Sequence, residues 1–209
     1  MFKRVLTISA HADDTAVCAG ATLINCYYTG AKNFDITFSQ HRGVPVNYFP
    51  ELISKEHEKA MKILKVGNSK LYDIGACNGE FISKSGWVRH TLEEARDTIR
   101  PDLVLTHPSF DTNQDHEALN KEVVRTFKSN CTILTYDFPA NVLRSEGAMV
   151  FFRISGKVVS LKLEAVQAYQ SQYRKDHLYM TSSVELASIR GMQIGREYAE
   201  AFYIERFII

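Results

Sequence analysis

One histidine and two adjacent aspartates stand together near the start of the chain, in the segment AHADDT at residues 10–15. An apolar run ends just before this segment, and a run of small residues begins just after it. Two carboxylates at the edge of a core repel each other and are costly to remove from water. A divalent metal ion would offset both costs, so the segment indicates a metal site that involves His11, Asp13 and Asp14.

A second polar loop, THPSFDTNQDHEAL at residues 106–119, carries a further histidine, His116. His11 and Asp14 lie three residues apart on a tight turn, and His116 would complete a His/Asp/His set. Three nitrogen and oxygen ligands with one open position describe a catalytic zinc site. Such a metal lowers the pKa of its water to about 7 and polarises a carbonyl group. Asp13 is then the candidate general base.

Each of these residues also has an ordinary structural interpretation. A histidine after a strand often fills a core, and paired acids at a helix start commonly cap the helix and balance its dipole. His107 precedes a proline and can simply shape its loop. The remaining histidines have no partner at ligand spacing, namely His41, His57, His90 and His177. The residue pattern alone therefore leaves both interpretations open.

Alternating strands and helices are predicted to position the two polar loops. The predicted strands are 4–10, 34–39, 70–75, 102–107 and 131–138, and the predicted helices are 15–28, 51–66, 85–100 and 114–128. This alternation indicates an α/β, Rossmann-like fold with a mostly parallel sheet and helices on both faces. Ligands of such sheets bind at the carboxyl ends of the strands, which is where both polar loops begin.

The pattern changes after about residue 140, beyond the last of the alternating units. Residues 148–155 and 199–208 favour strands, while residues 157–172 and 182–198 favour helices. We predict that this tail forms a lid or an edge element on the same domain, so that residues 1–209 make a single domain. The length of the chain suits one domain with a sizeable core.

The composition argues against several classes of partner. The chain has 25 basic and 24 acidic residues, a formal net charge of +1 and no Lys/Arg-rich run, so we expect no nucleic acid. No apolar run reaches the roughly 20 residues of a membrane span, and no signal peptide is visible. The four cysteines form no C-x-x-C pair and are typical of a reducing compartment. We expect a cytoplasmic protein, and a homo-oligomer is left open.

The two polar segments resemble motifs of the LmbE-like, or PIG-L, family of zinc-dependent de-N-acetylases. The opening motif of the family, AHPDDE, stands here as AHADDT, and its later motif, HPDH or HQDH, stands as NQDH at residues 113–116. The segments TILTYDFPAN, KLEAVQAYQSQ and RGMQIGREYAEAF resemble a later strand and the C-terminal elements of the family. The resemblance covers nearly the whole chain and implies an LmbE-like fold.

The resemblance also implies a role for each matching residue. It implies that His11, Asp14 and His116 bind Zn²⁺ or another divalent metal, and that Asp13 deprotonates the attacking water. The metal would stabilise the oxyanion, helped by neighbouring donors. The implied reaction removes the N-acetyl group of an N-acetylglucosamine-type sugar or its conjugate, which is a small-molecule substrate.

Three positions depart from the family pattern. Ala12 replaces a proline, which loosens the turn, and Thr15 replaces a glutamate, which removes a carboxylate near the ligands. Asn113 replaces a histidine that, in the family, pairs with the aspartate at Asp115 and assists the oxyanion or the leaving amine. An amide donates a hydrogen bond but cannot carry a proton. Asn113 and Asp115 are therefore predicted catalytic residues, with the acid role left open.

Further residues are predicted near the substrate, and other activities are left open. Arg42, in the loop after the second strand, would meet a phosphate or a sugar hydroxyl unless it is an ordinary surface arginine. Asp137, at the end of the fifth strand, would bind sugar or cap a turn. His41 or His107 would supply the acid that Asn113 lacks.

Two alternatives to a de-N-acetylase are left open. One is a deacylase for another N-acyl group, such as formyl, and the other is a catalytically weakened homologue that binds sugar or metal.

Overall fold

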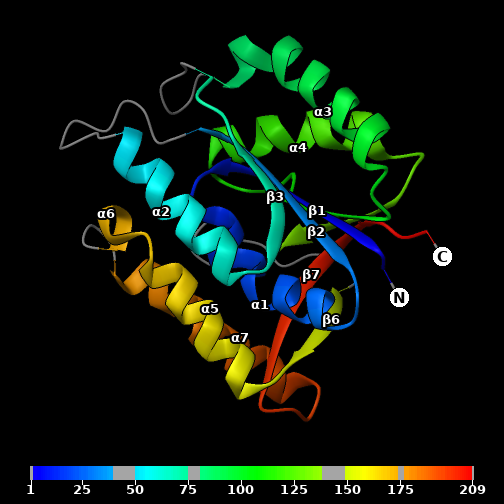
Figure 1. Cartoon of the computed structure of the whole chain (residues 1–209). Coiled ribbons are helices and arrows are strands. Elements are labelled where there is room, and N and C mark those ends of the chain that lie inside the picture. The colour runs from blue at the N-terminus through cyan, green and yellow to red at the C-terminus, as the bar shows by residue number, and fades with distance from the viewer. Residues whose placement is uncertain (1, 40–49, 75–80, 138–148, 174–176, 209) are drawn as a thin grey trace.

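The structure is a computed structural model that describes residues 2–39, 50–74, 81–137, 149–173 and 177–208. The strands of the described residues form one sheet of seven in the order β3-β2-β1-β4-β5-β7-β6 (Figure 1). Their bounds are β1 Arg4–His11, β2 Lys32–Ser39, β3 Val66–Leu71, β4 Leu103–Thr106, β5 Thr132–Tyr136, β6 Met149–Ile154 and β7 Tyr198–Arg206. The first five strands run parallel to one another, while β7 is antiparallel to both β5 and β6.

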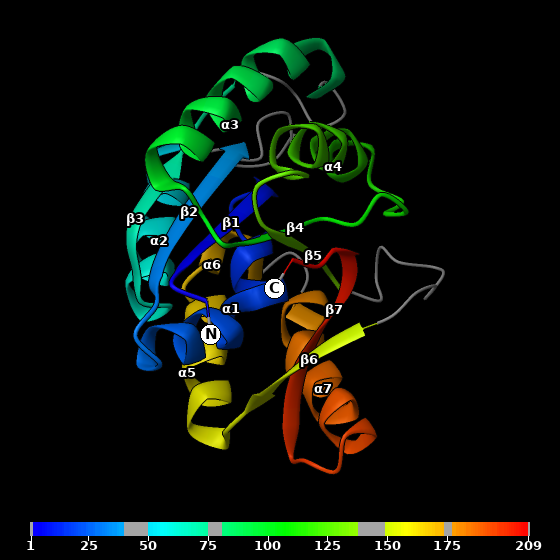
Figure 2. The same ribbon diagram turned by 90° about the vertical axis from the view of Figure 1, so that its right-hand side faces the viewer.

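Helices cover both faces of the sheet, with α3 and α4 on one face and α1, α2, α5 and α7 on the other (Figures 1 and 2). The helices are α1 Asp14–Tyr28, α2 Pro50–Ile63, α3 Ser85–Ile99, α4 Gln114–Phe127, α5 Gly156–Gln167, α6 Gln170–Tyr173 and α7 His177–Gln193, with a 3₁₀ turn at Phe81–Lys84. The mostly parallel α/β fold predicted from the sequence is thus confirmed.

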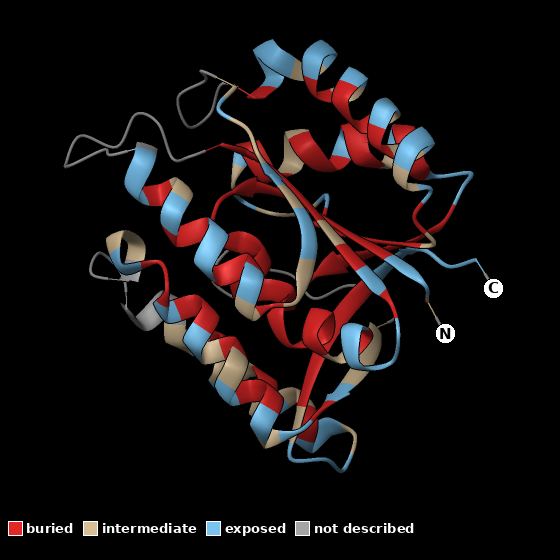
Figure 3. Ribbon diagram, viewed as in Figure 1, coloured by how far each residue is buried: buried red, intermediate tan, exposed pale blue. Residues whose placement is uncertain are grey.

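Side-chain alternation along β1 divides the interior into two cores. Leu6 and Ile8 point toward α3 and α4, while Val5 points toward α1 and α5, because successive residues of a strand face opposite sides of the sheet. Figure 3 shows the buried residues on the central strands and on the helix faces that turn toward them. The polar residues of β1, Thr7 and Ser9, are also fully buried, so they need hydrogen-bond partners inside the protein.

Several predicted element boundaries are wrong. The third strand spans Val66–Leu71 instead of 70–75, and the helix before it ends at Ile63 instead of 66. Lys65 adopts the left-handed backbone conformation, with φ of 61°, which stops the helix and turns the chain into the strand. The helix predicted at 182–198 is His177–Gln193. Gly195, with φ of 64°, lies in the turn that leads into β7.

Two forms are predicted for the tail, a lid or an edge element. Its strands form an edge of the sheet, which agrees with the edge element. β7 pairs with β5, and β6 pairs with the outer side of β7. Within the described part of the chain, no helix combines the length and the apolar character that a membrane crossing requires.

Candidate active site

The two polar loops meet because β1 and β4 are parallel neighbours in the sheet. His11 is the last residue of β1, and Asp14 is the first residue of α1. His116 lies in the first turn of α4, which follows β4. Ala10 and Ala12 are fully buried beside them, and their small side chains let the start of α1 pack closely against the end of the strand.

The three predicted metal ligands converge on one point. His11 Nδ1 lies 3.1 Å from His116 Nε2, and Asp14 Oδ2 lies 3.6 Å from His11 Nδ1 and 3.5 Å from His116 Nε2. Ligand atoms at about 2.0–2.1 Å from a tetrahedral zinc ion would be about 3.3–3.4 Å apart. All three side chains are buried. The cluster is thus suited to holding a small divalent cation.

A carboxylate stands behind each of the two histidines. His11 Nε2 lies 3.3 Å from Asp115 Oδ2, and His116 Nδ1 lies 2.8 Å from Asp111 Oδ2. A carboxylate in this position fixes the tautomer and the ring orientation of a metal-binding histidine. The remaining nitrogens, Nδ1 of His11 and Nε2 of His116, are the two atoms that face Asp14.

Asp111 is a site residue that sequence reasoning missed. Its Oδ1 accepts a hydrogen bond from the backbone N–H of Asn113 at 2.8 Å, while its Oδ2 contacts His116. An aspartate two residues before a helix cap is typical of an ordinary loop turn. Its position five residues before His116 is therefore the only sequence signal, and that signal is weak.

Charges within the cluster shift its pKa values. Burial would lower the pKa of His11, but hydrogen bonds to Asp115 and Asp14 raise that pKa to about 10. Burial would raise the pKa of Asp14, but the neighbouring His116 and His107 hold that pKa well below its ordinary value. The lowered pKa keeps the Asp14 carboxylate ionised at neutral pH.

His107 also lies inside the cluster. Its Nε2 lies 3.1 Å from Asp14 Oδ2 and accepts a hydrogen bond from the Ala10 N–H, also at 3.1 Å. Burial and the neighbouring His116 lower the pKa of His107 to about 4. The role of His107 as the substitute acid stays a prediction.

A second group, of His107, Asp111 and His116, also brings three potential ligand atoms close together. The rings of His107 and His116 are stacked, however, with centroids 3.7 Å apart and only 20° between their planes. Because the lone pair of a ring nitrogen lies in the plane of its ring, the nitrogens of two stacked, nearly parallel rings are poorly placed to bind one ion. We therefore interpret this group as support for His116.

The predicted catalytic residues lie beside the ligands. Asp13 is buried at the N-cap of α1, and its negative charge contributes to the raised pKa of His11. Asn113 caps α4, since its Oδ1 accepts a hydrogen bond from the Asp115 N–H at 2.9 Å. The Asp115 carboxylate, which the resemblance pairs with the residue at 113, contacts His11 here.

Residues 6–127 match the model of the family described as PIG-L, GlcNAc-PI de-N-acetylase. The chain belongs to the PIG-L family. The match spans both polar loops, and it confirms the family expected from the sequence motifs. No curated protein sequence matches the chain.

Solved structures share the fold of this PIG-L protein along nearly its whole length. The N,N'-diacetylchitobiose deacetylase of Pyrococcus horikoshii has a TM-score of 0.76 and 18% identity, covering 97% of this chain and 84% of its own. The conserved protein TT1542 of Thermus thermophilus has a TM-score of 0.79 and 20% identity, covering 100% and 97%. GalB of Pseudomonas putida, a 4-carboxy-2-hydroxymuconate hydratase, has a TM-score of 0.79 and 17% identity, covering 99% and 98%. At these identities, the likeness establishes the fold alone.

Three further predictions concern the surroundings of the PIG-L site. Arg42 and His41 lie outside the described residues. Asp137 Oδ2 accepts a hydrogen bond from Arg190 Nε at 2.6 Å, and its Oδ1 accepts one from the Tyr203 hydroxyl at 3.1 Å. Asp137 therefore ties the end of β5 to α7 and β7, and its contact with a sugar stays a prediction.

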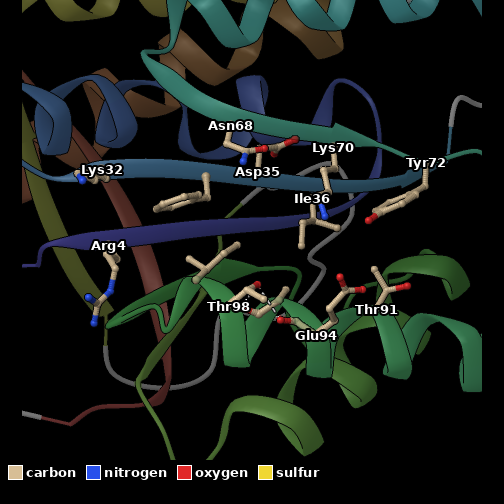
Figure 4. A pocket seen from close by; sticks show the side chains of 13 residues that line it. Arg4, Lys32, Asp35, Ile36, Asn68, Lys70, Tyr72, Thr91, Glu94 and Thr98 are labelled. Atoms are coloured by element: carbon tan, nitrogen blue, oxygen red, sulfur yellow. Dashed lines mark hydrogen bonds between the residues drawn. The ribbon is translucent and has the colours of Figure 1, made fainter.

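A hollow of about 400 Å³ lies between β2, β3 and α3, and His11, Asp14 and His116 do not line it (Figure 4). Its lining mixes charged and apolar side chains, including Lys32, Lys70, Tyr72 and Glu94. None of the predicted metal-binding or catalytic residues lines this hollow. The predicted ligands and catalytic residues lie instead at the ends of β1 and β4.

Proposed function

We propose that this PIG-L protein is a zinc-dependent hydrolase that removes the N-acetyl group of an N-acetylglucosamine-type amino sugar or its conjugate. The observation that carries the proposal is the convergence of His11, Asp14 and His116, with a carboxylate behind each histidine. The matching family is described as GlcNAc-PI de-N-acetylase, which agrees with removal of an N-acetyl group from N-acetylglucosamine. We further propose that residues 1–209 act as one domain, since the described strands form a single sheet.

The residues of the site divide the chemistry between them. When bound, Zn²⁺ would supply a water of pKa near 7 and polarise the acetamide carbonyl. Asp13, next to the ligand Asp14, would take the proton from the attacking water. Asn113 has no proton to give, so we assign the return of that proton to the leaving amine to Asp13 as well. The amide of Asn113 would donate a hydrogen bond to the oxyanion or to a sugar hydroxyl.

Release of acetate tests the proposal directly. The purified protein is incubated with N-acetylglucosamine and N,N'-diacetylchitobiose, and acetate and free amine are both measured. We expect them in equal amounts, with activity lost after chelation and restored by Zn²⁺. We also expect about one metal ion per chain by elemental analysis, because the cluster has one set of converging ligands. Parental metal content in His11→Ala and His116→Ala would contradict the proposed site.

Other outcomes would identify a different reaction on the same fold. Formate release from N-formyl sugars without acetate release would indicate a different acyl specificity. Sugar or metal binding without turnover would indicate a catalytically weakened homologue, which is the alternative suggested by Thr15 and Asn113. Contacts of Arg42 and Asp137 with the substrate are also proposals, and they would appear as an increase of KM in Arg42→Ala and Asp137→Ala. The cytoplasmic location stays a prediction from the sequence.

A further inference from the structure

A buried carboxylate lies beneath the metal-binding loop without belonging to it. Asp35, on β2, is only 1% exposed. Its side chain is surrounded by hydrogen-bond donors from three strands and two helices, at distances of 2.8–3.3 Å: Thr7, Thr15, Thr37, Ser69 and His57. Burial would raise the pKa of Asp35, but the hydrogen bond and charge of His57 lower it. The protein thus keeps an ionised carboxylate in its core, which is costly unless it is fully paired.

His57 connects this carboxylate to the loop. The ring comes from α2 and is buried. Its Nε2 lies 3.3 Å from Asp35 Oδ2 and 2.8 Å from Ser69 Oγ. Its Nδ1 lies 3.2 Å from the carbonyl oxygen of Ala12 and 2.9 Å from the Tyr169 hydroxyl. The imidazole therefore bridges the carboxylate and the backbone of the metal-binding loop.

The network touches the loop at two points, which lie on either side of the reactive residues. One point is the carbonyl of Ala12, held by His57, and the other is the hydroxyl of Thr15, which donates to Asp35 Oδ1 at 2.9 Å. Asp13 and Asp14 are the two residues between these points. Fixing both ends of so short a segment restricts the positions of both carboxylates.

The two contact points coincide with two of the departures from the family motif. Ala12 stands where the motif has a proline that would stiffen the turn, and Thr15 stands where it has a glutamate. His57 holds the loop at the position of the lost proline. The Asp35 carboxylate accepts a hydrogen bond from Thr15, which stands where the motif has glutamate. Residues of β2 and α2 thus contact the two positions at which this chain lacks the motif residue.

We propose that Asp35 and His57 are positioning residues of the metal centre, which hold Asp13 and Asp14 in place of the motif proline and glutamate. This inference rests on the metal centre of the proposed function. Outer partners of metal ligands typically contribute 10–100-fold to metal affinity. Asp35 and His57 act through Thr15 and Ala12, so we expect about a 10-fold effect, at the lower end of that range.

Two threonine variants separate positioning from simple stability. Thr7 and Thr15 are both fully buried, and both donate to Asp35 Oδ1, at 2.8 and 2.9 Å. Valine keeps the shape of threonine but removes the hydroxyl. Only Thr15 adjoins a metal ligand, whereas Thr7 lies within β1. We expect Thr15→Val to weaken Co²⁺ binding about 10-fold and to change the visible absorption of the bound Co²⁺. We expect Thr7→Val to leave both unchanged.

A second pair of variants tests the charges themselves. Asp35→Asn should weaken Co²⁺ binding and alter its absorption in the same way as Thr15→Val. The control is Glu56→Gln, because Glu56 is a buried acid that precedes His57 on α2 and accepts hydrogen bonds from Ser171 of α6. Glu56→Gln should lower the melting temperature without changing Co²⁺ affinity or absorption. Chelator competition gives the affinities, and circular dichroism confirms that each variant is folded.

The outcomes distinguish this inference from the proposed function. Folded Thr15→Val and Asp35→Asn variants with parental affinity and absorption would overturn the positioning role alone. An equal loss of affinity in Thr7→Val and Thr15→Val would also overturn it, because the effect would then be one of general stability. A parent protein that binds no Co²⁺ would overturn the metal centre and this inference with it. If Asp35→Asn does not fold, the threonine pair decides.

Discussion

At the scale of single residues, Asp13 is the side chain on which the proposed chemistry depends most. We expect Asp13→Asn to retain the metal but to lose hydrolysis by about 10²–10⁴-fold, because an amide keeps the shape of the carboxylate but takes no proton. Measurements of kcat/KM and metal content on the same preparations test this. His11→Ala is the control, since it should lose the metal as well. Near-parental turnover of Asp13→Asn would place the general base elsewhere.

Asn113 combines a structural and a chemical role, and two variants separate them. Asn113→Ala removes the cap of α4 and should lower the free energy of unfolding by about 0.5–2 kcal/mol. Asn113→Asp keeps a capping oxygen but loses the amide donor, so it should retain stability and lose kcat/KM. Chemical denaturation and kinetics on both variants provide the measurement. An Asn113→Asp variant as active as the parent would limit Asn113 to its capping role.

The candidate ligands could be predicted from the sequence, whereas the residues that contact them or their loop could not. His11, Asp14 and His116 stand in short motifs at strand ends, where the fold type itself implies a site. Asp111 resembles a turn residue. Asp35 lies inside a strand, and its partner His57 lies on a helix, so nothing local marks either residue. Their relation to the loop arises only when β1, β2 and α2 pack together.

At the scale of elements, the packing of α1 depends on a glycine. A Cβ atom on Gly20 would lie 3.1 Å from Leu64 Cδ2 and 3.3 Å from Lys162 Cγ, and both of these side chains are buried. Gly20→Ala should therefore lower the free energy of unfolding by about 1–3 kcal/mol through overpacking. Gly86 of α3 is the matched control, since a Cβ there meets no atom within 4 Å.

Gly86→Ala should leave stability unchanged or raise it by up to about 1 kcal/mol, because alanine loses less backbone entropy than glycine. Urea denaturation of the two variants gives the sign of each effect. If both substitutions shift the midpoint in the same direction, the close approach at Gly20 does not limit the packing of α1.

The predicted elements were most accurate where the strands are buried. β1, β4 and β5 are runs of almost entirely buried residues, rich in apolar and β-branched types, because both of their faces are covered. β3 is an edge strand with exposed residues at Gly67, Asn68 and Lys70, so it has no such run, and the sequence pattern placed it too late in the chain. The boundary before it is set by Lys65, a residue type that does not usually mark a left-handed turn.

At the scale of the whole molecule, a buried ion pair joins elements that are far apart in the sequence. Lys162 of α5 and Glu200 of β7 are 2% and 5% exposed, and Lys162 Nζ lies 2.7 Å from Glu200 Oε1. Glu200 also accepts hydrogen bonds from the backbone N–H groups of Ala21 and Thr22 in α1. The C-terminal strand is thereby tied to the helix that begins at Asp14, the predicted metal ligand, although the family match ends at residue 127.

This arrangement predicts an unequal response to the removal of either charge. Glu200→Met would leave the Lys162 ammonium buried without its carboxylate partner and would remove the hydrogen bonds to the Ala21 and Thr22 N–H groups, so we expect a loss of about 3–5 kcal/mol in the free energy of unfolding. Lys162→Met should lower the free energy of unfolding by less, because the Glu200 carboxylate keeps both N–H donors.

The double variant should lower the free energy of unfolding by less than the sum of the two single variants, since it removes both charges together. Urea denaturation of the three variants measures this coupling, and Arg89→Met, at a pair whose arginine is exposed, should have a much smaller effect. Losses that add to within about 0.5 kcal/mol would show that the two charges act independently, and the link between the C-terminal strand and α1 would then depend on apolar packing alone.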